Sequence, residues 1–140
     1  MLQSKGVDCG FLRHETSPTI TKLRILSRNQ QLIRLDFEES FHDVDLTSIY
    51  NQFDQQVANA GAVILSDYNK GALTDPQRLI QAARKAGTPV LVDPKGTDFS
   101  IYRGATLITP NLAEFEAVVG YCKDDETLFA KGKALLAEYD

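Results

Sequence analysis

Residues 89–120, PVLVDPKGTDFSIYRGATLITPNLAEFEAVVG, decide how the rest of the chain is arranged. Two short apolar runs lie here, Pro89–Val92 and Ala105–Thr109, and each has the length and β-branched content of a buried strand. Polar residues follow directly, at 93–96 after the first run and at 111–114 after the second. Ligands of open parallel α/β sheets bind beyond the carboxyl ends of the strands. The stretch therefore predicts a binding site at one edge of a parallel sheet.

Further elements on the N-terminal and C-terminal sides extend this pattern. The apolar run 61–66 predicts a third buried strand, and residues 74–86 predict a helix that Gly87 ends. Apolar residues at helical spacing over 45–59 predict another helix, and a last helix covers about 124–138. Strands that alternate with helices form βαβ units. The predicted fold class is therefore α/β, with a mostly parallel sheet.

Residues 19–38 carry a different pattern, in which apolar and charged residues alternate along two runs. Leu23 and Ile25 share one side of the first run, as Ile33 and Leu35 do in the second. Residues between the runs are typical of a turn. The alternation predicts an antiparallel ribbon with one apolar and one charged face. We expect the apolar face to pack either on a partner ribbon or on the body of the domain.

The composition is that of one acidic domain of modest size. The chain has 140 residues, of which 43% are hydrophobic, and its formal net charge is -4. This charge argues against a nucleic-acid partner, and no apolar run has the length of a membrane span. Cys9 and Cys122 lie far apart, which is typical of free thiols in a reducing compartment. We expect a single domain over residues 1–140 in the cytoplasm, with neither nucleic acid nor membrane as a partner.

Each of the three predicted strands is followed by a pair of polar residues. These pairs are Asp67 with Lys70, Asp93 with Lys95, and Asn111 with Glu114. If the strands are parallel neighbours, all three pairs lie at one edge of the sheet. An ammonium group attracts phosphate, and carboxylate or amide oxygens order Mg²⁺ and its waters. The pairs indicate nucleotide or sugar-phosphate chemistry.

Each pair also has a purely structural interpretation. Asn111 is a preferred N-cap residue, and Glu114 three positions later completes a capping box. Residues 93–96 are rich in turn formers, and 67–70 also fit a solvated loop. The chain contains neither a Walker A pattern nor a GxGxxG, so ordinary P-loop and dinucleotide sites have no support.

The hexapeptide Thr109-Pro110-Asn111-Leu112-Ala113-Glu114 resembles the Asn-x-x-Glu motif of ribokinase-like (PfkB family) carbohydrate kinases. Residues 19–38, 65–73 and 93–99 resemble, in the same order, the heptose 7-phosphate kinases of that family. The resemblance covers nearly the whole chain. It implies a partial ribokinase-like fold, with 19–38 as a lid ribbon and 61–140 as the α/β part of the nucleotide-binding body.

The resemblance also implies an activity, which is ATP-dependent phosphorylation of D-glycero-D-manno-heptose 7-phosphate at C1. This reaction leads toward the ADP-heptose used for lipopolysaccharide. ATP and Mg²⁺ are the implied cofactors, with Asn111, Glu114 and Lys95 near the ATP phosphates and Glu114 reaching the metal through water. The residues expected to bind the sugar phosphate are Lys22, Arg24, Arg34, Asp67, Lys70 and Asp93. The lid ribbons are expected to pair within a homo-oligomer.

Two motifs of the resembled family are missing from these 140 residues. One is a Gly-Gly substrate segment, and the other is Gly-Ala-Gly-Asp, which supplies the anion hole and the catalytic Asp. We therefore expect no catalytic base in this chain, which resembles the middle part of a kinase domain and is expected to be inactive alone. The alternative is a truncated, non-catalytic domain that binds nucleotide or a partner chain.

Overall fold

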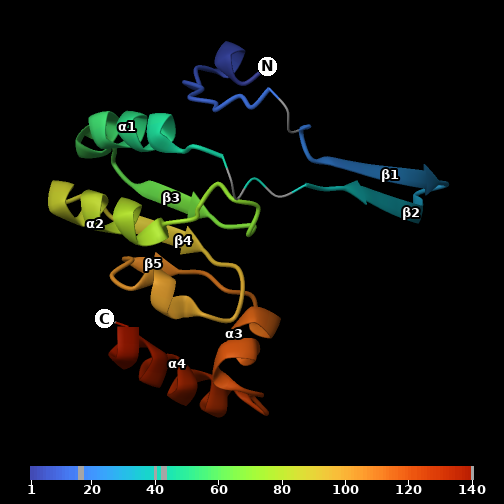
Figure 1. The fold of residues 1–140 in the computed structure, drawn as a ribbon. Helices are drawn as coiled ribbons and strands as arrows, with labels where there is room; N and C mark the ends of the chain where they lie inside the picture. The colour runs from blue at the N-terminus through green and yellow to red at the C-terminus, as the bar shows by residue number, and fades with distance from the viewer. Residues whose placement is uncertain (16–17, 40, 42–43, 140) are drawn as a thin grey trace.

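The computed structural model describes residues 1–15, 18–39, 41 and 44–139, and its architecture is α/β (Figure 1). In chain order, with η for 3-10 helices, the elements are η1 (Gln3–Lys5), β1 (Thr21–Ser27), β2 (Gln30–Phe37), α1 (Thr47–Gln56), η2 (Val57–Asn59), β3 (Val63–Ser66), α2 (Pro76–Ala86), β4 (Val90–Asp93), η3 (Phe99–Tyr102), β5 (Leu107–Ile108), α3 (Leu112–Val119) and α4 (Asp125–Tyr139). β1 and β2 form an antiparallel ribbon, and β3, β4 and β5 form a parallel sheet in that order. The predicted fold class is confirmed.

The core lies on one face of the parallel sheet, where α2 and η3 pack on the strands. Its members are buried and apolar: Val57, Val63, Leu65, Leu79, Ile80, Ala83, Val90, Val92, Phe99 and Tyr102. Burying side chains of this size contributes about 1.5–3 kcal/mol each, so this face provides most of the stability of the body. The other face is bare, because Ile64, Leu91 and Leu107 stand opposite one another in the register and Ile64 is 71% exposed. The prediction that 61–66 is a buried strand is therefore correct for one face only.

Local signals in the sequence account for the ends of α2. Asp75 caps its first turn by accepting a hydrogen bond from the backbone N–H of Arg78 at 3.1 Å, and Pro76 follows the cap. Gly87 ends the helix with φ 75°, a left-handed conformation that suits glycine. The predicted helix over 74–86 is confirmed, two residues shorter at its start.

The segment between β4 and β5 runs through the short helix η3. Asp98 caps η3 by accepting a hydrogen bond from the backbone N–H of Ser100 at 2.9 Å. β5 comprises two residues and is shorter than the predicted 105–109, because the Ala105 N–H bonds the carbonyl of Tyr102 in a turn instead. Hydrogen bonds to β4 nevertheless continue beyond β5, since the N–H of Thr109 donates to the carbonyl of Val92 at 2.9 Å.

The ribbon extends away from the body of the domain (Figure 1). Its register places Leu23 opposite Leu35 and Ile25 opposite Ile33, as the alternation predicted. The turn at Arg28 has φ 45° and continues through a second left-handed residue, a backbone shape that matches the twist of a tight hairpin. Every residue of both strands is exposed. The expectation that the apolar face packs on the body is therefore wrong, while packing on a partner ribbon remains a prediction.

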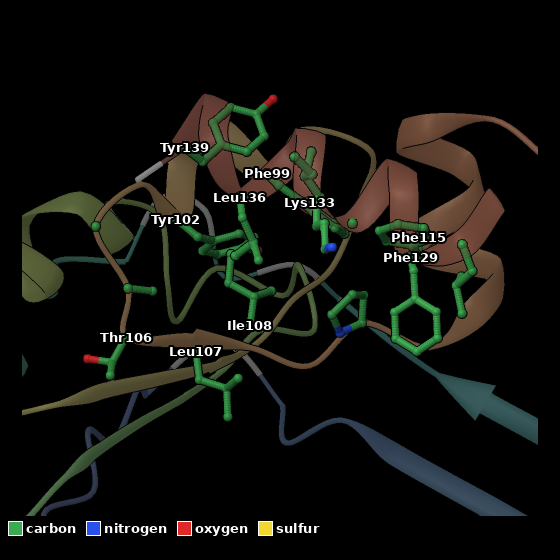
Figure 2. A pocket seen from close by; sticks show the side chains of 16 residues that line it. Phe99, Tyr102, Thr106, Leu107, Ile108, Phe115, Phe129, Lys133, Leu136 and Tyr139 are labelled. Carbon is green, nitrogen blue, oxygen red and sulfur yellow. The ribbon is translucent and has the colours of Figure 1, made fainter. Parts of the chain in front are cut away.

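An apolar groove of about 480 Å³ lies between the β5 region and the helices α3 and α4. Figure 2 shows Ile108 pointing toward Leu136 of α4, whereas Leu107 points to the opposite side. Arg103 joins η3 to the end of α4, since its guanidinium donates to the carbonyl of Glu138 at 3.0 Å and stacks on the ring of Tyr139. In the part of the chain that the structure describes, no helix is long and apolar enough to cross a membrane.

Candidate functional site

The carboxyl ends of β3, β4 and β5 meet around a pocket of about 300 Å³. The backbone brings them together, because the N–H of Asp67 donates to the carbonyl of Asp93 at 2.9 Å. Five of the residues predicted from sequence line this pocket, namely Asp67, Asp93, Lys95, Asn111 and Glu114. The prediction that polar residues after the three strands converge on one edge is confirmed, although Lys70 lies elsewhere.

Lys95, Asn111 and Glu114 form one bonded unit in this pocket. The Lys95 ammonium donates to Oε1 of Glu114 at 2.9 Å, and Oε2 accepts from the Asn111 N–H at 3.1 Å. Oδ1 of Asn111 accepts in turn from the Glu114 N–H at 3.0 Å, which completes the capping box of α3. The capping interpretation is thus confirmed, and the ion pair with Lys95 adds a feature that a capping box does not need.

The same contacts keep this unit charged. The hydrogen bond from Lys95, followed by that from the Asn111 backbone, lowers the pKa of Glu114 below its ordinary value. Glu114 raises the pKa of Lys95, with a smaller contribution from the charge of Asp93. At neutral pH the pocket therefore presents an ammonium beside a carboxylate, at the N-terminus of α3.

Asp67 is buried, with 9% of its surface exposed, so the solvated-loop interpretation of this residue is wrong. Oδ1 accepts a hydrogen bond from the Asn69 N–H at 2.7 Å, and Oδ2 accepts one from the Tyr102 hydroxyl at 2.6 Å. Both oxygens are therefore committed within the protein. Sequence reasoning assigned Tyr102 no role. A buried tyrosine usually bonds through its hydroxyl, but no local pattern marks Tyr102 as buried.

Asp93 differs from the other acidic residues of the pocket. It is half-buried at the end of β4, and its carboxylate makes no hydrogen bond within the described residues. Its oxygens are therefore available to accept hydrogen bonds from a substrate hydroxyl or from water around a metal ion.

The remaining predicted residues lie at the ribbon and not at this pocket. Lys70 pairs with Glu38 at the end of β2, and Glu38 also binds Lys22 of β1. These two hydrogen bonds lower the pKa of Glu38 to about 2, and the bond from Lys22 has the larger effect. Glu38 therefore joins the base of the ribbon to the loop after β3.

Two arginines stand opposite each other across the ribbon. Arg24 and Arg34 are paired in the register, and Arg34 is neutralised by Asp36, whose carboxylate accepts from Nη2 at 2.7 Å. Among the described residues Arg24 has no ion-pair partner. The structure thus separates the predicted substrate residues into a strand-edge group and a ribbon group.

A profile described as pfkB family carbohydrate kinase matches residues 1–139. This chain belongs to the pfkB family of carbohydrate kinases. The family resemblance inferred from the Asn111 to Glu114 motif and from the ribbon is therefore confirmed. Membership in a pfkB kinase family implies ATP as the phosphoryl donor.

This pfkB-family chain is similar to the bifunctional protein HldE. It is 59% identical over 139 residues to HldE of Escherichia coli O1:K1 / APEC, to that of E. coli strain K12 / DH10B and to that of Shigella boydii serotype 18 strain CDC 3083-94 / BS512. The matched segment covers 99% of this chain and 29% of each relative. The chain therefore spans less than a third of the length of these relatives.

The side chains of this pocket fit a hydrated magnesium ion that is held partly by the phosphates of a ligand. Within the described residues no cluster of three His, Cys, Asp or Glu side chains is arranged to bind a metal alone. Mg²⁺ keeps several waters and uses one or two carboxylates together with substrate phosphates. Asp93 and Glu114 line one pocket, so their carboxylates would be the ones available to such an ion.

Proposed function

We propose that this chain supplies the Mg·ATP side of a kinase that phosphorylates D-glycero-D-manno-heptose 7-phosphate at C1, on the route to the ADP-heptose of lipopolysaccharide. Membership in the pfkB family and 59% identity to HldE support a sugar kinase. The observation that carries the proposal is the unit of Lys95, Asn111 and Glu114 at the carboxyl edge of the sheet. The heptose is the substrate that the resemblance of residues 19–38 implies.

The chain's own residues would divide the work as follows. The Lys95 ammonium, which bonds Glu114 in the free chain, would leave this partner and donate hydrogen bonds to phosphate oxygens of the ligand. The first N–H groups of α3, next to Asn111, add donors for the same anion. Asp93 and Glu114 accept hydrogen bonds from the waters of a magnesium ion. Mg²⁺, when bound, neutralises charge on the β- and γ-phosphates.

The charge of the pocket makes this binding dependent on magnesium. Three carboxylates, from Asp67, Asp93 and Glu114, line the same pocket as one ammonium, from Lys95. The lining is therefore negative, and an unaccompanied triphosphate meets net repulsion there. ATP is expected to bind measurably with Mg²⁺ and weakly in its absence.

We propose that the ribbon is the lid over the sugar and pairs with the ribbon of a second subunit. Five side chains of one ribbon face are 38–59% exposed in the single chain: Leu23, Ile25, Ile33, Leu35 and Phe37. A partner ribbon would remove this apolar surface from water, at about 25 cal/mol per Å². Arg24 would place positive charge toward the 7-phosphate of the sugar, and Lys22 and Arg34 would add to it once the phosphate displaces their carboxylate partners.

These 140 residues by themselves are not expected to transfer phosphate. They contain no Gly-Ala-Gly-Asp sequence, the segment that provides the base and the anion hole in the resembled family. Loss of a positioned base alone costs about a hundred- to ten-thousandfold in rate. The missing segment also supports the second candidate, a domain that binds nucleotide or a partner chain without catalysis.

We propose a cytoplasmic location on chemical grounds. Cys9 and Cys122 are both free thiols in the structure. Free thiols are usual in reducing compartments, where glutathione and thioredoxin keep disulfides rare.

The test is a chimera of E. coli HldE in which residues 1–139 of this chain replace the matching segment. Phosphorylation of D-glycero-D-manno-heptose 7-phosphate by Mg·ATP is measured for the chimera, for unmodified HldE and for the isolated 140-residue chain. We expect the chimera to work within about tenfold of HldE and the isolated chain to show no turnover. A folded chimera that ignores this heptose phosphate would contradict the proposed substrate.

A further inference from the structure

Tyr102 is fully buried beside the strand edge, and its hydroxyl lies between the loops that follow β3 and β4. It donates a hydrogen bond to Oδ2 of Asp67 at 2.6 Å. The backbone N–H of Lys95 donates to the same hydroxyl oxygen at 3.2 Å. A tyrosine hydroxyl has one donor and two acceptor positions, so both bonds form at once. Tyr102 thus ties the loop after β3 to the loop after β4.

The element that carries Tyr102 is itself firmly anchored. The side-chain amide of Gln77 on α2 donates to the carbonyls of Ile101 and Arg103, at 3.0 and 2.9 Å, on both sides of Tyr102. Phe99, at the other end of η3, is also fully buried in the core. The hydroxyl is therefore held at a fixed point relative to α2 and the sheet, although η3 is only four residues long.

Within the described residues, the backbone of Lys95 forms hydrogen bonds only with the Tyr102 hydroxyl. Pro94, before Lys95, is fully buried, while Gly96 after it has φ 91° and turns the chain away. Between these two residues the Lys95 N–H bonds the Tyr102 hydroxyl, and the Lys95 ammonium reaches Glu114 at 2.9 Å. The hydroxyl therefore sets where the backbone of Lys95 sits, and hence where its ammonium enters the pocket.

We propose that Tyr102 is a positioning residue that holds Lys95 in register with Glu114 for contact with the phosphates of the nucleotide. The inference rests on the proposed function, because it takes Lys95 as the group that binds those phosphates. Tyr102 itself does not line that pocket, so it acts through Lys95 and through Asp67. A displacement of a binding group by about 1 Å can cost about a hundredfold in rate, which makes a single buried hydroxyl important here.

The hydroxyl remains a donor at every physiological pH. Burial, and then the hydrogen bond to Asp67, raises the pKa of Tyr102 above its ordinary value. Replacement by phenylalanine keeps the ring in the core but leaves Oδ2 of Asp67 without this donor and the Lys95 N–H without an acceptor. The ring's packing against Phe99 is expected to persist.

The experiment is a double-mutant cycle in the HldE chimera, with Tyr102→Phe, Lys95→Ala and the double variant. We expect Tyr102→Phe to lower kcat/KM for ATP about tenfold while the KM for the heptose phosphate stays within about twofold. In the Lys95→Ala background the additional loss is expected to be less than about twofold, because the group that Tyr102 positions is gone. Tyr50→Phe is the matched control, since its hydroxyl makes no hydrogen bond within the described residues.

The outcomes separate the two proposals. If Lys95→Ala leaves kcat/KM for ATP unchanged, Lys95 does not bind the nucleotide phosphates. Both the proposed phosphate site and the positioning role of Tyr102 then fail. If Lys95→Ala lowers kcat/KM for ATP and Tyr102→Phe does not, only the positioning role of Tyr102 is overturned. The same holds if both variants lower kcat/KM and their losses multiply in the double variant. Should Tyr102→Phe fail to fold, Asp67→Asn enters the same cycle. This variant removes the carboxylate charge that accepts the hydrogen bond of the Tyr102 hydroxyl. Its effect on kcat/KM for ATP is likewise expected to be smaller in the Lys95→Ala background.

Discussion

The ribbon and the strand edge contain the same kinds of charged residue but hold them in different ways. The ribbon's cations and carboxylates, such as Lys22, Glu38 and Asp36, pair with one another on strands that are exposed throughout. At the strand edge, by contrast, Asp67 is 9% exposed and Tyr102 is fully buried, and both bond loops that follow strands of the core sheet.

This difference separates a preorganised surface from an adaptable one. Exposed ion pairs contribute about 0–1 kcal/mol and are screened by salt, so the ribbon is held weakly to the body. Buried hydrogen-bonded groups resist displacement, because breaking them leaves an unsatisfied polar atom in the core. The strand edge is therefore suited to position phosphates, and the ribbon is suited to move or to pair with another chain.

The largest expected contrast is in stability. Phe99→Ala should lower the free energy of unfolding by about 3–5 kcal/mol, since Phe99 is fully buried and its removal leaves a cavity. Phe37→Ala removes the same ring from the ribbon, where it is 59% exposed, and should change stability by less than about 0.5 kcal/mol. Denaturant unfolding of both variants checks this, and equal losses would show that the ribbon packs on the body in solution.

Glu114→Gln should separate function from stability at the strand edge. Glutamine also completes a capping box, so the free energy of unfolding should change by less than about 0.5 kcal/mol. In the HldE chimera, turnover should fall about tenfold and the magnesium requirement should rise, because the carboxylate charge is lost. Glu116→Gln on the same helix is the control, since Glu116 bonds the Cys122 N–H instead. A large loss of stability with normal kinetics would reduce Glu114 to a helix cap.

Asn111→Ala should cost about 1 kcal/mol of unfolding free energy, because it removes the acceptor for the Glu114 N–H at the start of α3. Asn111→Asp keeps an acceptor and should restore most of the loss. Thermal and denaturant unfolding measure both variants side by side. No difference between them would mean that α3 starts without its side-chain cap.

Arg24→Ala in the chimera should raise the KM for the heptose phosphate by about three- to fivefold and leave the KM for ATP unchanged. This rise in KM is small because an exposed charge pair contributes little binding energy. The control is Arg28→Gly, which removes the same charge at the ribbon turn and suits its left-handed backbone of φ 45°. A rise in the KM for ATP instead would place the ribbon cations on the nucleotide side.

Acid should loosen the base of the ribbon, where Glu38 pairs with Lys22 and Lys70. Lys22 and Lys70 lower the pKa of Glu38 from 4.5 to about 2 in the folded chain. A carboxyl with a lowered pKa contributes its stability fully above pH 4.5, and this contribution is lost as the pH falls toward 2. Carboxyl NMR titration and amide exchange of the ribbon test this prediction, and a Glu38 midpoint near pH 4.5 would show that the ion pairs are absent in solution.

Features set by neighbouring residues were predictable from the sequence. Gly87 ends α2, Asn111 and Glu114 begin α3, and alternation sets the ribbon register, because each depends on residues a few positions apart. The polar residues after the strands were predictable as a site for the same reason, since strand ends can be located from the apolar runs.

The contacts that organise the site were not predictable, because they join residues that are distant in the chain. The hydroxyl of Tyr102 bonds a carboxylate 35 positions earlier, and Lys70 pairs with a carboxylate 32 positions earlier. Neither residue type nor spacing indicates such a pair. The exposure of Ile64 was missed for a related reason, since an apolar run does not reveal which face of the sheet is covered.

The most direct test of the proposed site is a crystal structure of the HldE chimera with Mg²⁺ and a non-hydrolysable ATP analogue. We predict that the phosphates lie in the pocket at the ends of β3, β4 and β5, with the Lys95 ammonium bonded to a phosphate oxygen. Asp93 or Glu114 should contact the magnesium ion through water. Phosphates bound elsewhere, with the Lys95–Glu114 ion pair undisturbed at 2.9 Å, would contradict the assignment.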